Sequence, residues 1–229
     1  GVSQPDAIVT GTAYGCLEDT GAFITRMVEH NEELLTPTAF IQSTHNTIGA
    51  QIALMLQCKN YNNAFVHRGF SFESALLDAA MLLNEGAAEN VLVGGIDEIT
   101  DISHTILTRL SLYKRNPVAN TALYTDNSKG TIAGEGAAFF LLENKPSDSA
   151  YAVLEGMATF YKPADQSETE KRISTFLTEH EISPEEIDLI VTGKNGDSSG
   201  DKLYAQLEQS LFKNTPVVNY KHLSGEYPT

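Results

Sequence analysis

The sequence has few of the features that mark membrane, secreted or disulfide-bonded proteins. No run approaches the roughly 18 apolar residues that a membrane helix needs, and residues 1–6 lack the basic and apolar regions of a signal peptide. The two cysteines, Cys16 and Cys58, are too few for a disulfide framework and lack zinc-site spacing, so both are interpreted as buried thiols. We therefore expect a cytoplasmic protein that does not associate with membranes.

Positive charge is scarce. The 229 residues include 15 Lys and Arg against 30 Asp and Glu, which gives a net charge of −15. Because nucleic-acid binding relies on clustered basic side chains, no nucleic-acid partner is expected. Arg109, Lys114 and Arg115 form the one local basic group, which we interpret as a solvated helix end, with docking of an acidic partner as the alternative.

Patterns that bind metals or cofactors are also missing. The six histidines show no metal-ligand spacing, and the glycine-rich segment 130–136 has no Lys-Ser/Thr pair to hold phosphates, so no metal or other cofactor is predicted. Asp97, Glu98 and Asp101 follow an apolar run. We interpret them as helix N-caps, with acid–base chemistry as the alternative.

Apolar segments alternate in a way that predicts an α/β fold. Strands are expected at residues 6–10, 64–67, 90–94, 136–143, 151–160, 187–192 and 216–219, and helices at 17–29, 47–57, 72–84, 167–180 and 202–212. The continuous apolar runs at 90–94 and 136–143 are typical of buried strands. A polar linker at 145–149 predicts an N-terminal half at 1–145 and a C-terminal half at 150–229.

The strand expected at 64–67 turns sharply into the helix expected at 72–84. α/β enzymes often mount a nucleophile at such a corner, because the helix dipole and free N–H groups stabilise an anion there. Ser71 lies at the corner, but Glu73 replaces the second glycine of a Gly-x-Ser-x-Gly elbow. Ser71 is therefore interpreted as a helix cap.

Residues 66–95 resemble the nucleophile region of the β-ketoacyl-acyl carrier protein synthases. In that family a strand and turn carry the cysteine, and an Ala-rich helix leads to a strand that ends in Gly-Gly. Counting back without gaps from Gly94 and Gly95, the cysteine position falls on Gly69. The segment 134–137 (Gly-Glu-Gly-Ala) matches the family's Gly-x-Gly-Ala, and 11–15 matches its early glycine-rich turn.

The two histidine motifs of the family are similar to two later segments. The family's His-Gly-Thr-Gly-Thr-x-x-Gly-Asp aligns with residues 193–201, where Gly193 replaces the histidine. Its Lys-x-x-x-Gly-His aligns with Lys221 to Glu226, where Glu226 replaces the second histidine. His222 lies nearby, so a shifted register is the alternative.

The resemblance implies a thiolase-like layered αβαβα architecture with mixed sheets, present here as a partial chain. It also implies that no catalytic residue is intact, since Gly69, Gly193 and Glu226 take the three positions. We expect a non-catalytic, chain-length-factor type of partner of an active ketosynthase in fatty acid, polyketide or polyene biosynthesis. The alternatives are an active acyl-carrier-protein-dependent condensing enzyme (an acyltransferase) and an interaction module. An enzyme would recruit from the neighbouring side chains His67, Ser71, Lys194, Lys221 and His222.

The resemblance further implies a dimer. Family members pair through the strand before the nucleophile turn, and here this edge is formed by Ala64, Phe65, Val66 and His67. We expect a homodimer or a heterodimer with an active ketosynthase, and an acyl carrier protein as a further partner. The amino-acid sequences of segments 43–47 and 67–72 are similar to those of a divergent ketosynthase branch that is associated with bacterial polyene-type pigment pathways. Family members have sequence before Gly1 and after Thr229, so a fragment is expected.

Overall fold

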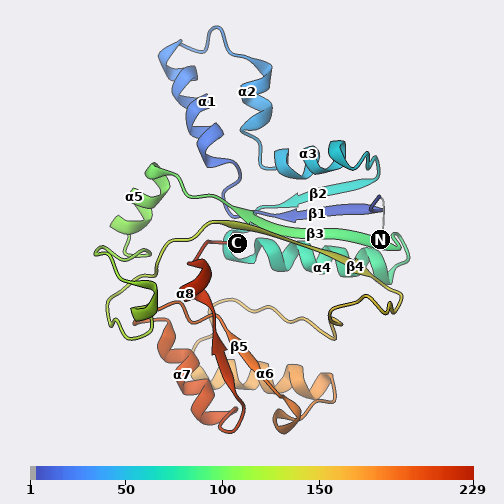
Figure 1. Cartoon of the computed structure of the whole chain (residues 1–229), viewed down its shortest axis with the longest axis vertical. Helices are drawn as coiled ribbons and strands as arrows, with labels where there is room; N and C mark the ends of the chain where they lie inside the picture. The colour runs from blue at the N-terminus through green and yellow to red at the C-terminus, as the bar shows by residue number, and fades with distance from the viewer. Residues whose placement is uncertain (1–3) are drawn as a thin grey trace. The chain divides into compact units, whose positions relative to one another are not determined.

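The computed structural model describes residues 4–229. The sequence analysis predicts no signal peptide at residues 1–6, and the first three of these residues lie outside the described range. The chain forms two compact units (Figure 1). Unit 1 comprises Gly1–Ser103, Glu135–Ala150 and Tyr227–Thr229, and unit 2 comprises His104–Gly134 and Tyr151–Glu226. The continuous halves 1–145 and 150–229 stay a prediction. No helix of the described residues is long and apolar enough to cross a membrane.

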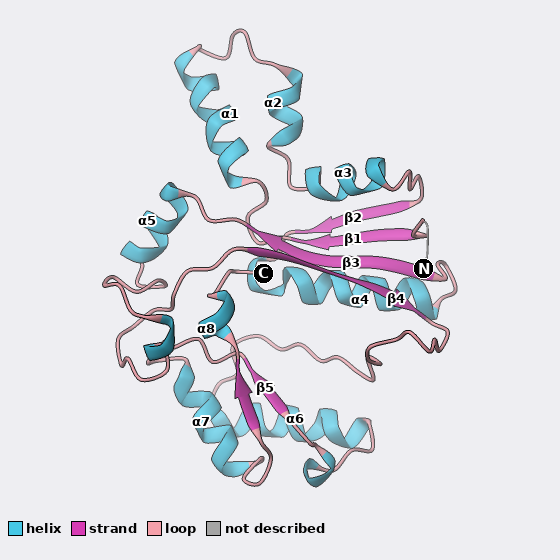
Figure 2. Cartoon of the chain, viewed as in Figure 1, coloured by secondary structure: helices cyan, strands magenta, loops and turns pink. Residues whose placement is uncertain are grey.

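A mixed four-stranded sheet with the order β2-β1-β3-β4 organises unit 1 (Figure 2). The strands are β1 (Ala7–Gly11), β2 (Tyr61–Phe65), β3 (Asn90–Asp97) and β4 (Gly136–Glu143). β1 pairs in parallel with β2 and β3, whereas β4 runs antiparallel to β3. The carboxyl ends of the three parallel strands therefore meet at one edge of the sheet, as they do where α/β proteins build their sites.

The core of unit 1 lies between the sheet and α4 (Ser71–Asn84), while α3 (Thr47–Met55) covers the opposite face (Figure 2). Every residue of β1 is buried, as expected for a strand that is covered on both faces. Small side chains on α4 let its backbone approach the strands closely. The buried cluster consists of Ala7, Val9, Ala75, Ala79, Leu83, Ala88, Val91 and Val93.

Two further helices of unit 1 are α1 (Leu17–Glu29) and α2 (Pro37–Gln42). The structure confirms the predicted bounds of α1, but α2 was not predicted. Its start has a recognisable signal, because Thr36 Oγ1 accepts a hydrogen bond from the Ala39 N–H at 3.4 Å and proline takes the first helical position. Its six residues are too few for hydrophobic periodicity to be visible.

Unit 2 contains a two-stranded parallel sheet of β5 (Ile190–Thr192) and β6 (Val217–Asn219). Its helices are α6 (Gln166–Glu179), α7 (Asp201–Ser210) and α8 (Lys221–Ser224), with short 3-10 turns at Asn120–Ala122 and Pro184–Glu186. α5 (Asp101–Arg109) begins in unit 1, whose first segment ends at Ser103, and continues in unit 2, which begins at His104. The predicted capping box from Ser183 to Glu186 is present and opens a 3-10 turn.

Three expected strands differ in the structure. The strand expected at 64–67 is Tyr61–Phe65, so Val66 and His67 lie in the following turn. The first residues of this strand are polar, so the apolar pattern did not predict its start. Asn62 is one of them, and its side chain donates a hydrogen bond to Gly49 O at 2.9 Å. The segment 151–160 forms no strand, since no neighbouring strand pairs with it. β4 has the predicted bounds but is not buried, because it is the outer strand and its Phe140 is 53% exposed.

The contact between β1 and α4 predicts a severe effect of a methyl group at Gly11. A Cβ there would lie 2.6 Å from the backbone C and O of Ser71, so Gly11→Ala has to push the helix away from the strand. We expect a loss of about 1–3 kcal/mol in the free energy of unfolding, measured by urea denaturation. Gly21→Ala in α1 is the control, because nothing lies within 4 Å of its Cβ. Equal stabilities of the two variants would contradict this packing argument.

Candidate functional site

The corner that precedes α4 is well defined in unit 1. β2 ends at Phe65, a 3-10 turn spans Arg68–Phe70, and α4 begins at Ser71. Arg68 takes the left-handed conformation, with φ of 54°, that lets the chain reverse within three residues. A Cβ at position 69 would have only Pro228 O within 4 Å, at 3.5 Å, which is an ordinary contact. Position 69 would therefore accept a Cβ atom without a clash, and glycine leaves it without a side chain.

Ser71 holds this corner together. It is fully buried, and its Oγ accepts a hydrogen bond from the His67 N–H at 2.9 Å. The hydroxyl proton is shared between Thr12 O at 3.0 Å and Arg68 O at 2.6 Å. The interpretation of Ser71 as a helix cap was wrong, because the hydroxyl ties two turns together and does not accept from the first turn of its own helix. Its one hydroxyl proton is therefore engaged by backbone carbonyls.

The His67 ring turns to another serine. Its Nδ1 lies 3.0 Å from Ser74 Oγ, and the ring contacts Phe65 edge-on with 6.0 Å between centroids. His67 therefore does not form a nucleophile–base pair with Ser71, which needs a hydrogen bond between the ring nitrogen and the serine hydroxyl. Of the candidates at this corner, His67 and Ser71 are neighbours in space but are not coupled for catalysis.

The carboxylates at the end of β3 fix the adjacent turn. Asp97 Oδ1 accepts from Thr12 Oγ1 at 3.1 Å and from the Ala13 N–H at 3.0 Å, and Glu98 accepts from the N–H of Glu18 in α1 at 3.0 Å. Neither caps α5, so that interpretation of Asp97 and Glu98 was wrong. The sequence places them just before α5, but the sheet brings the end of β3 beside the end of β1.

Both cysteines lie away from the corner, since no sulfur is within 4 Å of a Cβ at position 69. Cys58 is buried as predicted, and its thiol donates to Pro5 O at 3.2 Å. Cys16 is only partly buried; this burial raises the pKa of its thiol, and Glu98 and Asp19 raise it further. A raised pKa disfavours the reactive thiolate. The described residues contain no group of three or more His, Cys, Asp or Glu placed to hold a metal ion.

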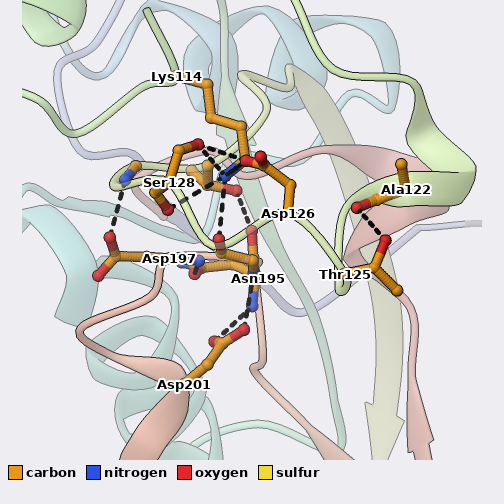
Figure 3. A network of polar contacts seen from close by, with 11 residues as sticks. Lys114, Ala122, Thr125, Asp126, Ser128, Asn195, Asp197 and Asp201 are labelled. Carbon is orange, nitrogen blue, oxygen red and sulfur yellow. Dashed lines mark hydrogen bonds and ion pairs between the residues drawn. The ribbon is translucent and has the colours of Figure 1, made fainter.

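A buried lysine organises the loops of unit 2 (Figure 3). Lys114 Nζ lies 2.8 Å from Asp126 Oδ2, 3.0 Å from Ser128 Oγ and 3.0 Å from Gly196 O, and its side chain is 4% exposed. The Lys114 ammonium lowers the pKa of Asp126, and Ser128 lowers it further. The interpretation of Lys114 as part of a solvated basic group was therefore wrong.

Two aspartates shape the segment that resembles the first histidine motif. Asp201 accepts from the N–H groups of Asn195 at 3.0 Å and Gly196 at 2.9 Å, so the loop folds back on the first turn of α7 (Figure 3). Asp197 accepts from the N–H groups of Gly130 at 2.7 Å and Gly200 at 2.9 Å. Burial opposes the charge of Asp197, but these N–H groups lower its pKa overall.

The remaining predicted site residues of unit 2 occur as ion pairs. Lys194 Nζ lies 2.7 Å from Glu208 Oε1, and Lys221 Nζ lies 3.1 Å from Glu226 Oε2. Burial lowers the pKa of Lys221, whereas Glu226 and Tyr220 raise it. The two residues together outweigh the burial, so the pKa of Lys221 is raised overall. The ammonium of Lys221 and the carboxylate of Glu226 therefore neutralise each other.

His222 and Gly193 complete the set. The His222 N–H donates to Tyr124 Oη at 3.3 Å, and the two rings meet edge-on with 5.5 Å between centroids. Its buried Nδ1 has no hydrogen-bond partner among the described residues. At Gly193 a Cβ would lie 2.6 Å from the hydroxyl oxygen at the end of the Tyr204 side chain, which comes from α7. Tyr204 was not singled out in the sequence, because nothing in its neighbourhood marks it.

The mixed sheet of unit 1 and its strand–turn–helix corner are those of ketosynthase-like proteins with the thiolase-type fold. The family model "Beta-ketoacyl synthase, N-terminal domain" matches residues 18–169, which is more than half of the chain. The chain therefore belongs to the beta-ketoacyl synthase family. Both the predicted family and the predicted fold class are confirmed.

Individual relatives agree with this assignment. A Streptomyces virginiae protein named as a polyketide beta-ketoacyl synthase is 26% identical over 220 residues, which are 86% of this chain and 50% of the relative. A chain of the complex between a ketosynthase and its chain length factor from Xenorhabdus doucetiae matches with a TM-score of 0.71 at 18% identity, over 97% of this chain and 56% of that chain.

A type II polyketide synthase structure, in which an acyl carrier protein is bound to its ketosynthase, matches with a TM-score of 0.73 at 15% identity, over 99% of this chain and 62% of that chain. At these identities the two solved structures establish the fold. The chain spans about half the length of the curated relative that it matches.

The Lys114 network predicts a pH-dependent loss of stability in Lys114→Met. At neutral pH the variant leaves three oxygens without their buried donor, and we expect the melting temperature to fall by about 4 °C or more. Because Lys114 lowers the pKa of Asp126, this stabilisation is present above the ordinary aspartate pKa of about 4 and is lost as the pH falls through the lowered value. The melting-temperature difference from the unsubstituted protein should therefore shrink in acid.

Lys145→Met is the matched control for this measurement, because Lys145 and its partner Glu89 are 79% and 81% exposed. An exposed pair contributes little to stability, so the control should melt like the unsubstituted protein. A melting-temperature difference for Lys114→Met that stays constant from pH 7 to acid would contradict the role assigned to the Asp126 pair.

Proposed function

We propose that this ketosynthase-like chain does not catalyse condensation and acts as the chain-length-factor type of partner of an active ketosynthase in polyketide or fatty acid biosynthesis. The observation that carries the proposal is the corner before α4, where position 69 is a glycine and so offers no nucleophile, although a Cβ there would meet only an ordinary contact. Acyl transfer through an enzyme-bound thioester requires a thiolate at that point.

The positions aligned with the two histidines support the same conclusion. Each histidine would donate a hydrogen bond to developing negative charge. Gly193 has no side chain, and Glu226 carries a carboxylate that pairs with Lys221. A carboxylate accepts hydrogen bonds and does not donate them, so Glu226 in its ion pair with Lys221 would not supply the donor that an enolate needs.

The alternative of an active enzyme needs a substitute nucleophile and base. Ser71 is buried and its hydroxyl proton is held by the backbone carbonyls of Thr12 and Arg68, while the ring of His67 bonds to Ser74. Lys194 is paired with Glu208. These arrangements stabilise the fold and leave no activated nucleophile among the candidates, which favours the non-catalytic proposal.

We further propose pairing through the free edge of β2. The order β2-β1-β3-β4 leaves the outer edge of β2 without a neighbouring strand in unit 1. The Phe65 carbonyl accepts from the Thr12 N–H, on the β1 side. Since backbone groups alternate along a strand, the N–H of Ala64 points to the free edge, where it contacts only the side chain of Asn63 at 3.0 Å. Free strand edges are templates for pairing with another chain.

The partner would be an active ketosynthase or a second copy of this chain, and the acyl group would arrive on an acyl carrier protein. The ketosynthase bound to its chain length factor and the acyl carrier protein bound to its ketosynthase are solved precedents for both contacts in proteins of this fold. An interaction module that only shares the fold is the second candidate. It would not copurify with a ketosynthase that contains the cysteine.

The catalytic part of the proposal is tested by incubating the chain alone with acyl and malonyl carrier proteins. We expect no gain in mass on the protein and no condensation product. Gly69→Cys should fold, because its Cβ meets only an ordinary contact, and its thiol should be alkylated by iodoacetamide. It should still give no condensation, since residues 193 and 226 lack donors. Acyl-enzyme formation or condensation by the unsubstituted chain would refute the proposal.

The pairing part is tested by Ala64→Pro. Proline removes an N–H that points to the free edge, so we expect the variant to keep its circular dichroism and melting temperature while it loses its partner. Ala64→Val keeps the N–H and is the control. Pairing is measured by analytical ultracentrifugation and by pull-down of the coexpressed ketosynthase. A folded Ala64→Pro variant that pairs as strongly as the control would rule out this edge.

A further inference from the structure

Three glycines of unit 1 lie where its parallel strands end. Gly69 follows β2 in the corner before α4. Gly95 of β3 pairs with Gly11, the last residue of β1, and Gly136 opens β4 beside the last residue of β3. This is the edge at which α/β proteins bind their ligands. None of the three glycines adds a side chain to it.

Residues 227–229, which we call the strap, lie along this edge with one residue against each glycine. A Cβ at position 136 would lie 3.4 Å from the Tyr227 ring, and a Cβ at position 69 would lie 3.5 Å from Pro228 O. A Cβ at position 95 would lie 3.0 Å from Thr229 Cγ2. All three strap residues are half-buried, and Figure 2 shows the end of the drawn chain, marked C, beside the start of α4. The strap therefore packs on the edge that the glycines leave bare.

The residue before the strap is fixed. Glu226 O accepts a hydrogen bond from the Gly134 N–H at 2.8 Å, and the Glu226 N–H donates to Ile132 O at 2.8 Å. The side chain of Glu226 pairs with Lys221 at 3.1 Å. Residue 226 is therefore held through both its backbone and its side chain, which limits how far the strap can move from its place.

The far end of the strap is held less firmly. Thr229 Oγ1 is buried and has no hydrogen-bond partner among the described residues. A buried hydroxyl without a partner is unfavourable, so the side chain of Thr229 contributes packing and no hydrogen bond to the contact. We therefore expect that the loss of a few packing atoms opens the strap.

We propose that the strap occludes the carboxyl edge of the unit 1 sheet and keeps the hydrocarbon part of an acyl group away from Gly69. A Cβ at position 69 meets only an ordinary contact, so a short side chain is accepted there, whereas a long group would have to share the edge with the strap. The inference rests on the proposed function and adds a steric barrier to the missing nucleophile. The acyl group is thereby left to the partner's site.

The strap is tested in the Gly69→Cys background with two reagents that alkylate a thiol by the same reaction, iodoacetamide and N-octyl-iodoacetamide. Both rates are normalised to those of glutathione. We expect the ratio of the long-chain rate to the short-chain rate to rise about tenfold when Tyr227→Ala removes the ring from the edge. Deletion of residues 227–229 should raise the ratio at least as much. Peptide mass spectrometry separates the introduced thiol from Cys16 and Cys58.

Tyr151→Ala in the same background is the matched control, because Tyr151 is fully exposed and its loss should leave the ratio unchanged. Circular dichroism and the melting temperature show that each variant is folded. Tyr227→Ala keeps the chain intact and covers the case in which the shortened chain does not fold. Equal ratios with and without the Tyr227 ring, or a long reagent that reacts as fast as the short one in Gly69→Cys itself, would overturn the occlusion.

The two proposals fail in different ways. Condensation by the unsubstituted chain would refute the non-catalytic function, whereas the alkylation ratios do not depend on catalysis. Unchanged ratios without condensation would refute the strap and leave the non-catalytic function intact.

Discussion

Unit 1 depends on the close approach of β1 to the start of α4. Gly11 lies so near the backbone of Ser71 that a methyl group would not fit, and Ser71 Oγ bonds to Thr12 O on the neighbouring turn. This contact fixes the position of the helix start relative to the carboxyl ends of the parallel strands. It also engages the proton of the Ser71 hydroxyl in backbone hydrogen bonds. The contact that positions the helix thereby occupies a side chain that could otherwise have served as a nucleophile.

Unit 2 depends on a different kind of interaction. The ammonium of Lys114 gathers oxygens from two segments far apart in sequence, residues 126–128 and Gly196, and a buried charge is tolerated only when such partners surround it. Asp201 and Asp197 bind backbone N–H groups of the loop that follows β5. The loop is therefore held from both sides by charged groups.

The three positions that the resemblance aligns with the family's cysteine and histidines differ in their surroundings. At position 69 a Cβ would meet an ordinary contact, at position 193 it would lie 2.6 Å from the end of the Tyr204 side chain, and at position 226 the carboxylate pairs with Lys221. The order around these positions fits the proposed role of a partner subunit, which presents a shaped surface without turning over the substrate.

The sequence by itself determined the family, the helix α1, the outline of α4 and the glycine at position 69, since these rest on local periodicity and on motifs whose spacing is kept. Only the tertiary structure decided that Ser71 links two turns by hydrogen bonds, that Lys114 is buried and that the Tyr204 hydroxyl lies close to Gly193. Such contacts join residues that are distant along the chain or that carry no motif, and local pattern does not encode them. Apolar runs likewise predicted β4 correctly but not its exposure, because burial depends on which layers cover a strand.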